Sequence, residues 1–368
     1  MNTNTNYDIG DIIALFHNEN PISYKLEEIR LQEDDSRWII YVNFADEKYV
    51  IKIAANNFTT PERVNAWVEL IAEYRKMGYY SPEMKLSRNG NYSEQVIFMG
   101  KQCIVWEDEF ARFNFQKDLD KSVYIGADNR PVYFNEVIEF IGRIAQKHFS
   151  GFPGKSGYAR LEPWVQEDIT DEVTECVREL DKLVKSKAPH FTERWQEILK
   201  LWEKNRDELK KIYGLLPTSV FQADWNENNL LLDDNGHFKG VIDYNIAGED
   251  TCLNMFLSMI IFGYIYGHFE LNEINESTRY LVKDWFIDVM LENLREFGKY
   301  YDFTEIEATA APMLYKYIIT IYYMEIDAFN KNVGDDGKLN LLFDLIEREL
   351  TREDIDFRRA MLVNDEKR

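Results

Sequence analysis

The sequence is poor in cysteine, with Cys103, Cys176 and Cys252 as the only three among 368 residues. Their number is odd, and their wide spacing matches neither a disulfide framework nor a metal-binding cluster. This scarcity excludes a disulfide-stabilised scaffold. It favours a protein whose cysteines stay reduced, and we therefore predict a cytoplasmic location.

Basic residues are also in deficit: 43 Lys and Arg stand against 65 Asp and Glu, so the formal net charge is −22. Binding of nucleic acid requires basic patches that neutralise phosphates, and this balance argues against such a partner. An acidic surface keeps a protein soluble, and it can also attract a cationic small molecule.

Long apolar runs are missing as well. The most apolar stretch, residues 252–267, is short for a membrane span and contains Asn254 and Ser258. The first eight residues have neither the basic section nor the apolar section of a signal peptide. We predict a soluble protein without a membrane segment, in which residues 252–267 form a buried core helix.

Apolar and aromatic residues are present in ordinary amounts, 45% and 14%, which is enough to build one large or two medium domains. Strand patterns cover 38–44, 48–53, 94–99 and 102–106. A helix interrupts them, beginning at Thr60 and Pro61 and ending near Gly78. From about residue 131 the patterns are helical, over 137–148, 165–187, 192–213, 253–266, 276–300, 304–329 and 339–350, with a solvated tail after 356. The fold class is α+β.

One strand pair stands out in this helical half. Leu230–Leu232 reads as a buried strand, and 238–242 reads as its antiparallel partner. Asn235 and Gly236 between them form the strongest two-residue hairpin signal. Counting back from this turn pairs Asn229 with Ile242, so Asn229 and Asp243 meet at the open end of the hairpin.

A second carboxylate precedes this hairpin, because Asp224 lies five residues before Asn229. Two carboxylates and an amide oxygen at one strand end can hold a hard divalent cation and orient a hydroxyl group. These are the requirements of phosphoryl transfer. The alternative for this segment alone is an acidic hairpin with ordinary turn chemistry.

Asp224-x-x-x-x-Asn229, a short hairpin and then Ile242-Asp243-Tyr244 together resemble the catalytic and metal-binding core of the aminoglycoside phosphotransferase family, which includes choline kinase relatives. The resemblance implies a bilobal protein-kinase-like fold. It implies that Asp224 is the catalytic residue, which takes the proton of the acceptor hydroxyl, and that Asn229 and Asp243 are the ligands of Mg²⁺.

The resemblance also divides the chain into lobes. Residues 1–106 would form a β-rich nucleotide-binding lobe, 107–110 a hinge, and 111–368 a mostly helical catalytic and substrate-binding lobe. The main chain of Glu107 and Glu109 in the hinge would bind the adenine, with both side chains facing solvent.

A lysine inside the 48–53 strand, Lys52, resembles the lysine that contacts the nucleotide phosphates. Taken alone, its pattern favours a lysine on an edge strand with its charge in solvent. Its expected partner is a carboxylate on the following helix. Glu69 is the first choice, Glu73 one turn later is the rival, and Glu62 is a distant third.

Two departures from the family pattern matter. Gln222 stands where the family usually has a histidine, two residues before the catalytic aspartate. The loop expected to cover the phosphates, near residues 31–37, contains no glycine, and Asp34 and Asp35 would repel phosphates if they pointed inward. We expect Ser36 or its main chain to contact the β-phosphate.

The function implied by the resemblance is an ATP- or GTP-dependent, Mg²⁺-dependent kinase that phosphorylates a hydroxyl of a small molecule. Aminoglycosides, choline-like amines and amino-alcohols are cationic and fit an acidic cleft, whereas sugars such as methylthioribose would not need one. The alternative is a catalytically silent relative that binds a nucleotide or small molecule. Gln222 and the acidic loop favour this alternative, while the intact Asp224, Asn229 and Asp243 oppose it.

Overall fold

The computed structural model describes residues 6–31, 33–126, 130–161, 171–268 and 284–362. Within this part of the chain, two compact units are present. The first contains Met1–Glu136, Gly151–Gly154 and Gln222–Gly248, and the second contains Val137–Ser150, Lys155–Phe221 and Glu249–Arg368. The first unit therefore includes both the strand-rich segment and the hairpin on which the sequence places its candidate site.

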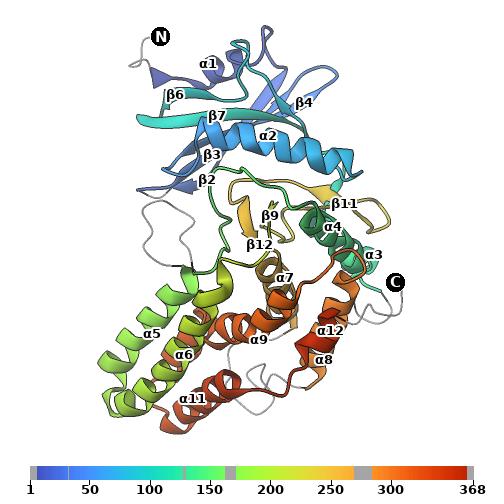
Figure 1. The fold of residues 1–368 in the computed structure, drawn as a ribbon. Coiled ribbons are helices and arrows are strands. Elements are labelled where there is room, and N and C mark those ends of the chain that lie inside the picture. Colours follow the sequence, from blue (N-terminus) through green and yellow to red (C-terminus); the bar gives the residue numbers. More distant parts are fainter. Residues whose placement is uncertain (1–5, 32, 127–129, 162–170, 269–283, 363–368) are drawn as a thin grey trace. The chain divides into compact units, whose positions relative to one another are not determined.

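A seven-stranded sheet dominates the first unit (Figure 1). Its order is β1-β6-β7-β4-β3-β2, with the short β5 paired to β7. The bounds are β1 Asn6–Tyr7, β2 Ser23–Leu31, β3 Ser36–Asn43, β4 Lys48–Ala55, β5 Met84–Lys85, β6 Glu94–Phe98 and β7 Lys101–Glu109. Neighbours pair antiparallel except β1 with β6. The four predicted strands are all present, whereas β2 was not predicted, because it is a mostly exposed edge strand without an alternating apolar face.

The two faces of this sheet differ in chemistry because side chains alternate along each strand. One face packs the apolar residues Trp38, Ile40, Ile51, Ile53 and Val105 against the short helix α1, Ile9–Ala14. The other face carries Lys52, opposite Trp106 in the β4–β7 ladder.

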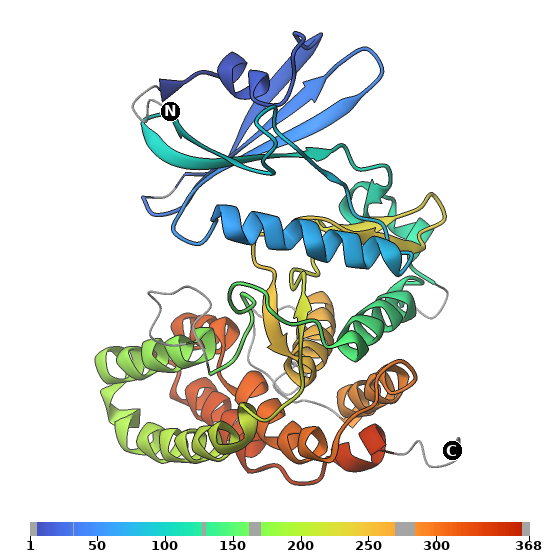
Figure 2. The same ribbon diagram turned by 45° about the horizontal axis from the view of Figure 1, so that its top comes forward.

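Helix α2, Pro61–Lys76, lies along the sheet in both ribbon views (Figure 2). Its start follows the expected chemistry: Thr60 accepts a hydrogen bond from the Arg63 N–H, and Pro61 occupies the first turn, where its missing N–H is not needed. Past its end, Gly78 has a φ of 90°, which glycine adopts at little cost. The sequence prediction of this helix is confirmed.

The predicted hairpin forms β10, Leu230–Leu232, and β11, Phe238–Val241, and β8, Asn114–Phe115, joins β10 on its other side. The turn differs from the prediction. The Asp233 N–H donates to the His237 carbonyl at 2.9 Å, so the loop contains Asp234, Asn235 and Gly236 rather than two residues.

The register at the open end is nevertheless as predicted, because a second irregularity cancels the first. Leu232 pairs with Phe238 and Leu231 with Gly240, so Lys239 is a bulge residue. This extra residue offsets the longer loop. The Ile242 N–H donates to the Asn229 carbonyl at 3.0 Å, which places Asn229 opposite Ile242.

The hairpin is held to the segment that follows α2. The Tyr80 N–H donates to the Lys239 carbonyl at 2.7 Å, and the Val241 N–H donates to the Tyr80 carbonyl at 3.1 Å. A Cβ atom on Gly240 would lie 1.6 Å from the Tyr80 oxygen. Only glycine permits this approach of two backbones, and the hairpin is thereby fixed within the first unit.

The second unit is mostly helical. Its described helices are α5 Glu172–Lys187, α6 Thr192–Tyr213, α7 Cys252–His268, α8 Asp284–Phe297, α9 Glu305–Thr320, α10 Tyr323–Asn332, α11 Asp336–Thr351 and α12 Phe357–Leu362, together with most of α4, Phe134–Lys147. The short η1 Gln116–Asp118 and α3 Lys121–Tyr124 belong to the first unit, and η2 Pro189–Phe191 to the second. Strands β9, Thr218–Phe221, and β12, Gly248–Thr251, pair with each other.

Most predicted helices are confirmed, with two differences. The predicted helix over 304–329 is two helices, α9 and α10. The tail expected after residue 356 is the helix α12, whose Phe357 and Met361 are buried. The predicted starts at 165 and 276 lie outside the described residues.

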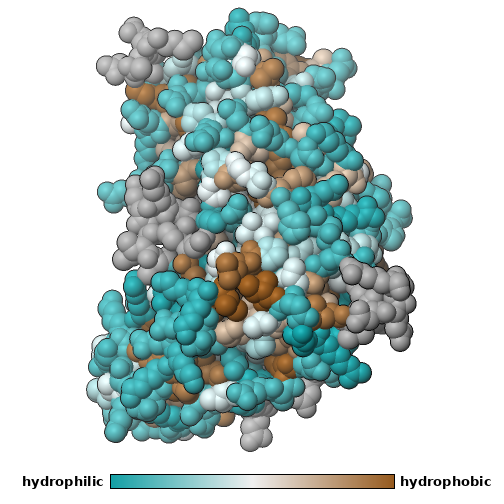
Figure 3. All heavy atoms as spheres, viewed as in Figure 1, coloured by the Kyte–Doolittle hydropathy of each residue, from teal (hydrophilic) through white to brown (hydrophobic). Residues whose placement is uncertain are grey.

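The 252–261 part of α7 is buried, as predicted for a core helix. No helix among the described residues has the length and apolarity required to cross a bilayer. Polar side chains cover most of the face seen in Figure 3, which agrees with the high content of charged residues.

Candidate active site

The buried side chain of Gln222 connects the segment before the hairpin to the segment after it. Its amide nitrogen donates to the carbonyls of Ile242 (2.7 Å) and Asp243 (2.6 Å). Its amide oxygen accepts the Asp224 N–H at 2.9 Å. An amide carries both donors and acceptors, so this one residue holds the main chain on both sides of the candidate site. Glutamine stands here in place of the histidine expected from the family resemblance, and it connects the two segments structurally.

Two non-glycine residues next to these bonds have left-handed backbone conformations. Ala223 has a φ of 72° and Asp243 a φ of 61°. Such residues cost free energy, of order 1–3 kcal/mol each, and are kept where the surroundings impose them. The hydrogen bonds of Gln222 adjoin both positions and account for their persistence.

Asp224 is held from its own loop. Its carboxylate accepts a hydrogen bond from Asn226 at 2.5 Å, and its carbonyl accepts one from the Asn229 amide at 3.2 Å. Burial raises the pKa of Asp224, and the Asp243 carboxylate raises it further. The two aspartates therefore lie close enough to repel each other.

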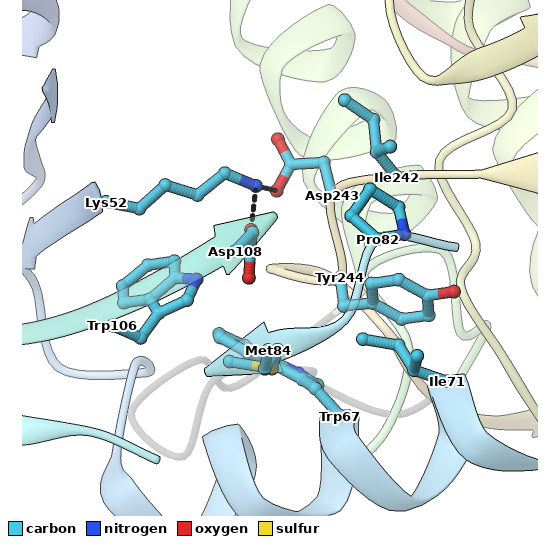
Figure 4. A pocket seen from close by; sticks show the side chains of 10 residues that line it. All are labelled: Lys52, Trp67, Ile71, Pro82, Met84, Trp106, Asp108, Ile242, Asp243 and Tyr244. Atoms are coloured by element: carbon cyan, nitrogen blue, oxygen red, sulfur yellow. Dashed lines mark ion pairs between the residues drawn. The ribbon is translucent and has the colours of Figure 1, made fainter. Parts of the chain in front are cut away.

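Lys52 extends from β4 between two carboxylates (Figure 4). Its Nζ lies 3.2 Å from Asp108 and 3.9 Å from Asp243. Burial disfavours its charge, but the carboxylates of Asp108 and Asp243 prevail and raise its pKa. Lys52 is thus a buried cation, and the solvated edge-strand interpretation does not apply.

The expected pair between Lys52 and Glu69 is not present. Glu69 is exposed on α2, and the side of this helix that lines the pocket around Lys52 presents Trp67 and Ile71. Residues two apart on a helix point about 200° apart, so Glu69 faces away when Trp67 faces the sheet. The rival, Glu73, pairs with Lys76 instead.

Glu107 and Glu109 belong to the last part of β7 rather than to a free connector. The Glu107 backbone is flanked by Ile51 on β4 and Lys85 on β5, and the Glu109 N–H donates to the Glu83 carbonyl at 2.9 Å. These engaged positions do not suit the adenine contacts expected of them.

Their side chains also differ from the expectation of solvent exposure. Glu107 is 1% exposed and contacts His17 at 2.7 Å, and its burial raises its pKa. Glu109 accepts a hydrogen bond from the Tyr80 hydroxyl and lies 3.2 Å from Arg112. Both carboxylates serve contacts within the first unit.

The segment expected to cover the phosphates has a different arrangement from the one predicted. Ser36 is buried on the apolar face with Trp38, and its hydroxyl accepts a hydrogen bond from Lys101 at 2.7 Å. Asp35 accepts two hydrogen bonds from Arg37, at 2.9 Å each. Despite its burial, the bonds from Arg37 and Asn56 lower the pKa of Asp35. Its charge is thus engaged by a cation, and Ser36 faces away from Lys52.

Helix α2 contributes structural support and no carboxylate for Lys52. The Arg63 guanidinium donates to the Ala247 carbonyl at 2.6 Å, and the Tyr74 hydroxyl accepts the Gln222 N–H at 3.1 Å. Just beyond the helix, the Ser81 hydroxyl donates to the Val241 carbonyl at 2.7 Å. The contacts of Arg63 and Ser81 fix the main chain on either side of Asp243, and the contact of Tyr74 fixes Gln222.

The donor chemistry of the site fits a hard divalent cation. Asn229 and Asp243 lie at the open end of the hairpin, and the charge of Asp243 acts on the Asp224 carboxylate. All three side chains supply oxygen atoms. Asp243 is about a third exposed, 35%, so its carboxylate is accessible. A cation would relieve the repulsion between the two aspartates. No group of three His, Cys, Asp or Glu side chains that could hold a metal ion occurs in the described part of the chain, and this donor set includes the amide of Asn229.

Sequence reasoning missed Asp108, Tyr74 and Arg63. Asp108 could have been found only from the pairing of β4 with β7, because Lys52 faces Trp106 and Asp108 is two residues further along the same face. Tyr74 and Arg63 carry no local signal beyond their place on the buried side of a helix.

The chain combines a curled β-sheet with a helix, a β-hairpin and a mostly helical second unit, and this is a protein-kinase-like α+β fold. Among solved structures, a complex of the amicoumacin kinase hAmiN with AMP-PNP, Ca²⁺ and Ami matches 96% of this chain and 97% of its own, with 13% identity and a TM-score of 0.52. A microcompartment-associated aminopropanol kinase (12% identity, 92% and 93% coverage, TM-score 0.48) and a spectinomycin phosphotransferase (10%, 91% and 92%, 0.43) also match.

The sequence itself identifies the family. Residues 33–252 match the model of the phosphotransferase enzyme family, and this span covers more than half of the chain. The chain belongs to this family and is a small-molecule phosphotransferase. No curated protein matches the sequence significantly.

Proposed function

We propose that this protein is a Mg²⁺-dependent kinase that transfers the γ-phosphate of ATP to a hydroxyl group of a small molecule. The observation that carries the proposal is the contact between Lys52 and Asp243, 3.9 Å apart, beside Asp224. One compact unit thus contains a cation to bind phosphates, a carboxylate to bind a metal ion and a carboxylate to accept a proton.

In this proposal Asn229 and Asp243 hold the metal ion, which when bound neutralises negative charge on the phosphates. Lys52 binds phosphate oxygens. Its pKa is raised despite its burial, because Asp108 and Asp243 favour the charged form, so the ammonium group is charged at neutral pH.

Asp224 orients the acceptor hydroxyl and accepts its proton. Burial raises the pKa of its carboxyl group, as does Asp243 nearby, which makes it a better proton acceptor than an exposed aspartate. The hydrogen bond from Asn226 to its carboxylate and that from its own N–H to Gln222 restrict its position. Catalysis of phosphoryl transfer depends mainly on such positioning.

The acceptor is expected to be cationic, because the net charge of −22 favours attraction of amines. Amino-alcohols, choline-like amines and aminoglycosides are the classes to test first, because each carries both a cationic amine and a hydroxyl group.

The decisive experiment has two stages. Thermal shifts with adenosine, ADP, ATP and GTP, each with and without Mg²⁺, identify the donor. A library of amino-alcohols, choline-like amines, aminoglycosides and neutral sugars is then assayed for ADP release. We expect a Mg²⁺-dependent shift with ATP and turnover of at least one amine-bearing alcohol. Tight Mg·ATP binding without turnover of any hydroxyl compound would contradict the proposal and favour a nucleotide-binding role.

A further inference from the structure

Lys52 has a carboxylate partner that comes from a neighbouring strand. Trp106 on β7 pairs with Lys52 on β4, and Asp108 lies two residues further on the same face of the sheet. The Lys52 ammonium group is 3.2 Å from the Asp108 carboxylate, and the two side chains are only 16% and 15% exposed. This is a largely buried ion pair between two rigid strands.

Helix α2 leaves no room for a competing carboxylate. The positions that face the same pocket are Trp67 and Ile71, and the Trp67 ring lies 5.4 Å from the Trp106 ring. Trp67 is 1% exposed, so it fills the space next to Lys52 with apolar surface. Glu69 is exposed on the opposite side of the helix.

We propose that Asp108 is the positioning residue that orients Lys52 toward the phosphates of the nucleotide, and that no glutamate of α2 has this role. The inference rests on the proposed function for the identity of the ligand. A lysine side chain is long and flexible, so a fixed partner is needed to keep its charge in one place. Asp108 supplies this partner from a strand that is paired with β4, β5 and β6.

The second neighbour of Lys52, Asp243, cannot replace Asp108 in this role. Its contact is longer, 3.9 Å against 3.2 Å, and its side chain is more exposed. In the proposed function its carboxylate also serves the metal ion. Asp108 comes from β7 and not from the hairpin, and its ion-pair partner among the described residues is Lys52, at 3.2 Å.

The pairing gives a test that needs no ligand, because a buried charge is costly when its partner is removed. Lys52→Met should lower the Tm, since Asp108 is then left as an uncompensated carboxylate. Asp108→Asn alone should also lower the Tm. In the Lys52→Met background, however, Asp108→Asn should raise the Tm by removing the orphaned charge.

This reversal of sign is specific to a direct pair. Glu69→Gln is the matched control, and we expect it to leave the Tm unchanged in both backgrounds because Glu69 is exposed. If Asp108→Asn lowered the Tm equally in the wild-type and Lys52→Met backgrounds, the direct pair between Asp108 and Lys52 would be contradicted. A sign reversal for Glu69→Gln would return the role to the helix.

A ligand measurement separates positioning from a merely structural role. Asp108→Asn should weaken Mg·ATP binding on the order of 10-fold, the size of a lost charge-assisted contact, and leave adenosine binding unchanged. Asp108→Glu keeps the charge and should recover part of this loss. Equal losses for adenosine and Mg·ATP would overturn the proposal. If the wild-type protein bound both ligands equally, the proposed function itself would fail, whereas the stability cycle would still decide whether Asp108 holds Lys52.

Discussion

Two buried polar clusters, one in each unit, differ in how completely their charges are satisfied. The Asp250 cluster of the second unit consists of Asp250, Ser156, Thr251 and Asn254. The Asp250 carboxylate accepts hydrogen bonds from the Ser156 hydroxyl (2.8 Å), the Thr251 N–H (2.7 Å) and the Asn254 amide (2.9 and 3.0 Å). These hydrogen-bond donors are neutral, both carboxylate oxygens are engaged, and the nearby Arg160 cation also favours the charged carboxylate.

The Lys52 cluster of the first unit consists of Lys52, Asp108 and Asp243. One cation faces two carboxylates there, and the Asp224 carboxylate adds to the negative charge. The Lys52 cluster has more negative than positive charge, whereas both oxygens of the Asp250 carboxylate accept hydrogen bonds. The comparison teaches that burial of a carboxylate does not by itself mark a functional site. An unbalanced charge is the better indicator of a functional site, because a bound cation would neutralise it.

The Asp250 cluster also explains why asparagine stands at position 254. Burial raises the pKa of Asp250 to about 6, despite the hydrogen bonds that favour its charged form. A second carboxylate beside it would repel that charge, whereas the Asn254 amide donates to it. Thr251, whose hydroxyl accepts the Asn254 N–H at 3.2 Å, caps the start of α7.

The largest expected effect is on turnover, from Asp224→Asn. In the proposed mechanism Asp224 aligns the acceptor and takes its proton, so kcat should fall by about 10²–10⁴-fold while Mg·ATP binding stays near the wild-type value. Steady-state kinetics with the identified acceptor and nucleotide titration measure the two quantities. Full activity in this variant would move the chemistry to another residue.

A smaller effect, on metal-dependent binding, is expected from Asp243→Ala. The variant should lose about 10- to 100-fold in affinity for Mg·ATP relative to the metal-free nucleotide, because it lacks one of the two protein ligands that we propose for the metal. Asp250→Ala is an unsuitable control, since it empties a saturated buried cluster. Glu69→Ala is the better control, and it should bind Mg·ATP with wild-type affinity. Unchanged Mg·ATP affinity in Asp243→Ala would remove Asp243 from the metal site.

An effect of about 10-fold on kcat is expected from Gln222→Ala, because its hydrogen bonds to the carbonyls of Ile242 and Asp243 and its bond from the Asp224 N–H are lost together. Gln222→His should recover part of the rate, since an imidazole ring can replace only some of these bonds. Adenosine binding measured alongside separates misalignment from unfolding. A fully active Gln222→Ala protein would show that the connection is dispensable.

The Asp250 cluster should affect stability and not turnover. The folded-state pKa of Asp250, about 6, exceeds the ordinary value of 3.8, so the folded protein binds this proton more tightly than the unfolded chain. This contribution to stability is complete below pH about 4 and is lost as the pH rises to about 6, with a total of about 3 kcal/mol.

Denaturant unfolding of wild type and Asp250→Asn over this pH range measures that contribution. The wild-type free energy of unfolding should decrease more than that of the variant between pH 4 and 6. Parallel curves for the two proteins would contradict the assignment.

The sequence by itself determined the elements and the hairpin residues of the candidate site. The Thr60-Pro61 start of α2, the helical spacing of the second unit and the position of Asn229 opposite Ile242 all follow from local rules of capping, periodicity and turn formation. Local rules suffice there because each feature depends on residues that are neighbours in the chain. The hairpin register agrees with the prediction although the loop is longer than predicted, because the bulge at Lys239 offsets the extra loop residue.

Only the tertiary structure decided which carboxylate meets Lys52. The choice depends on the register of β4 against β7, which places Asp108 next to Lys52 across 56 residues of sequence, and on Trp67 occupying the facing side of α2. It also decided that Ser36 and Glu107 lie on the opposite face of the sheet, and that Gln222 links Asp224 to Asp243. A strand reverses its face with each residue, so a side chain's surroundings are fixed by pairing and packing with distant segments, which local sequence does not specify.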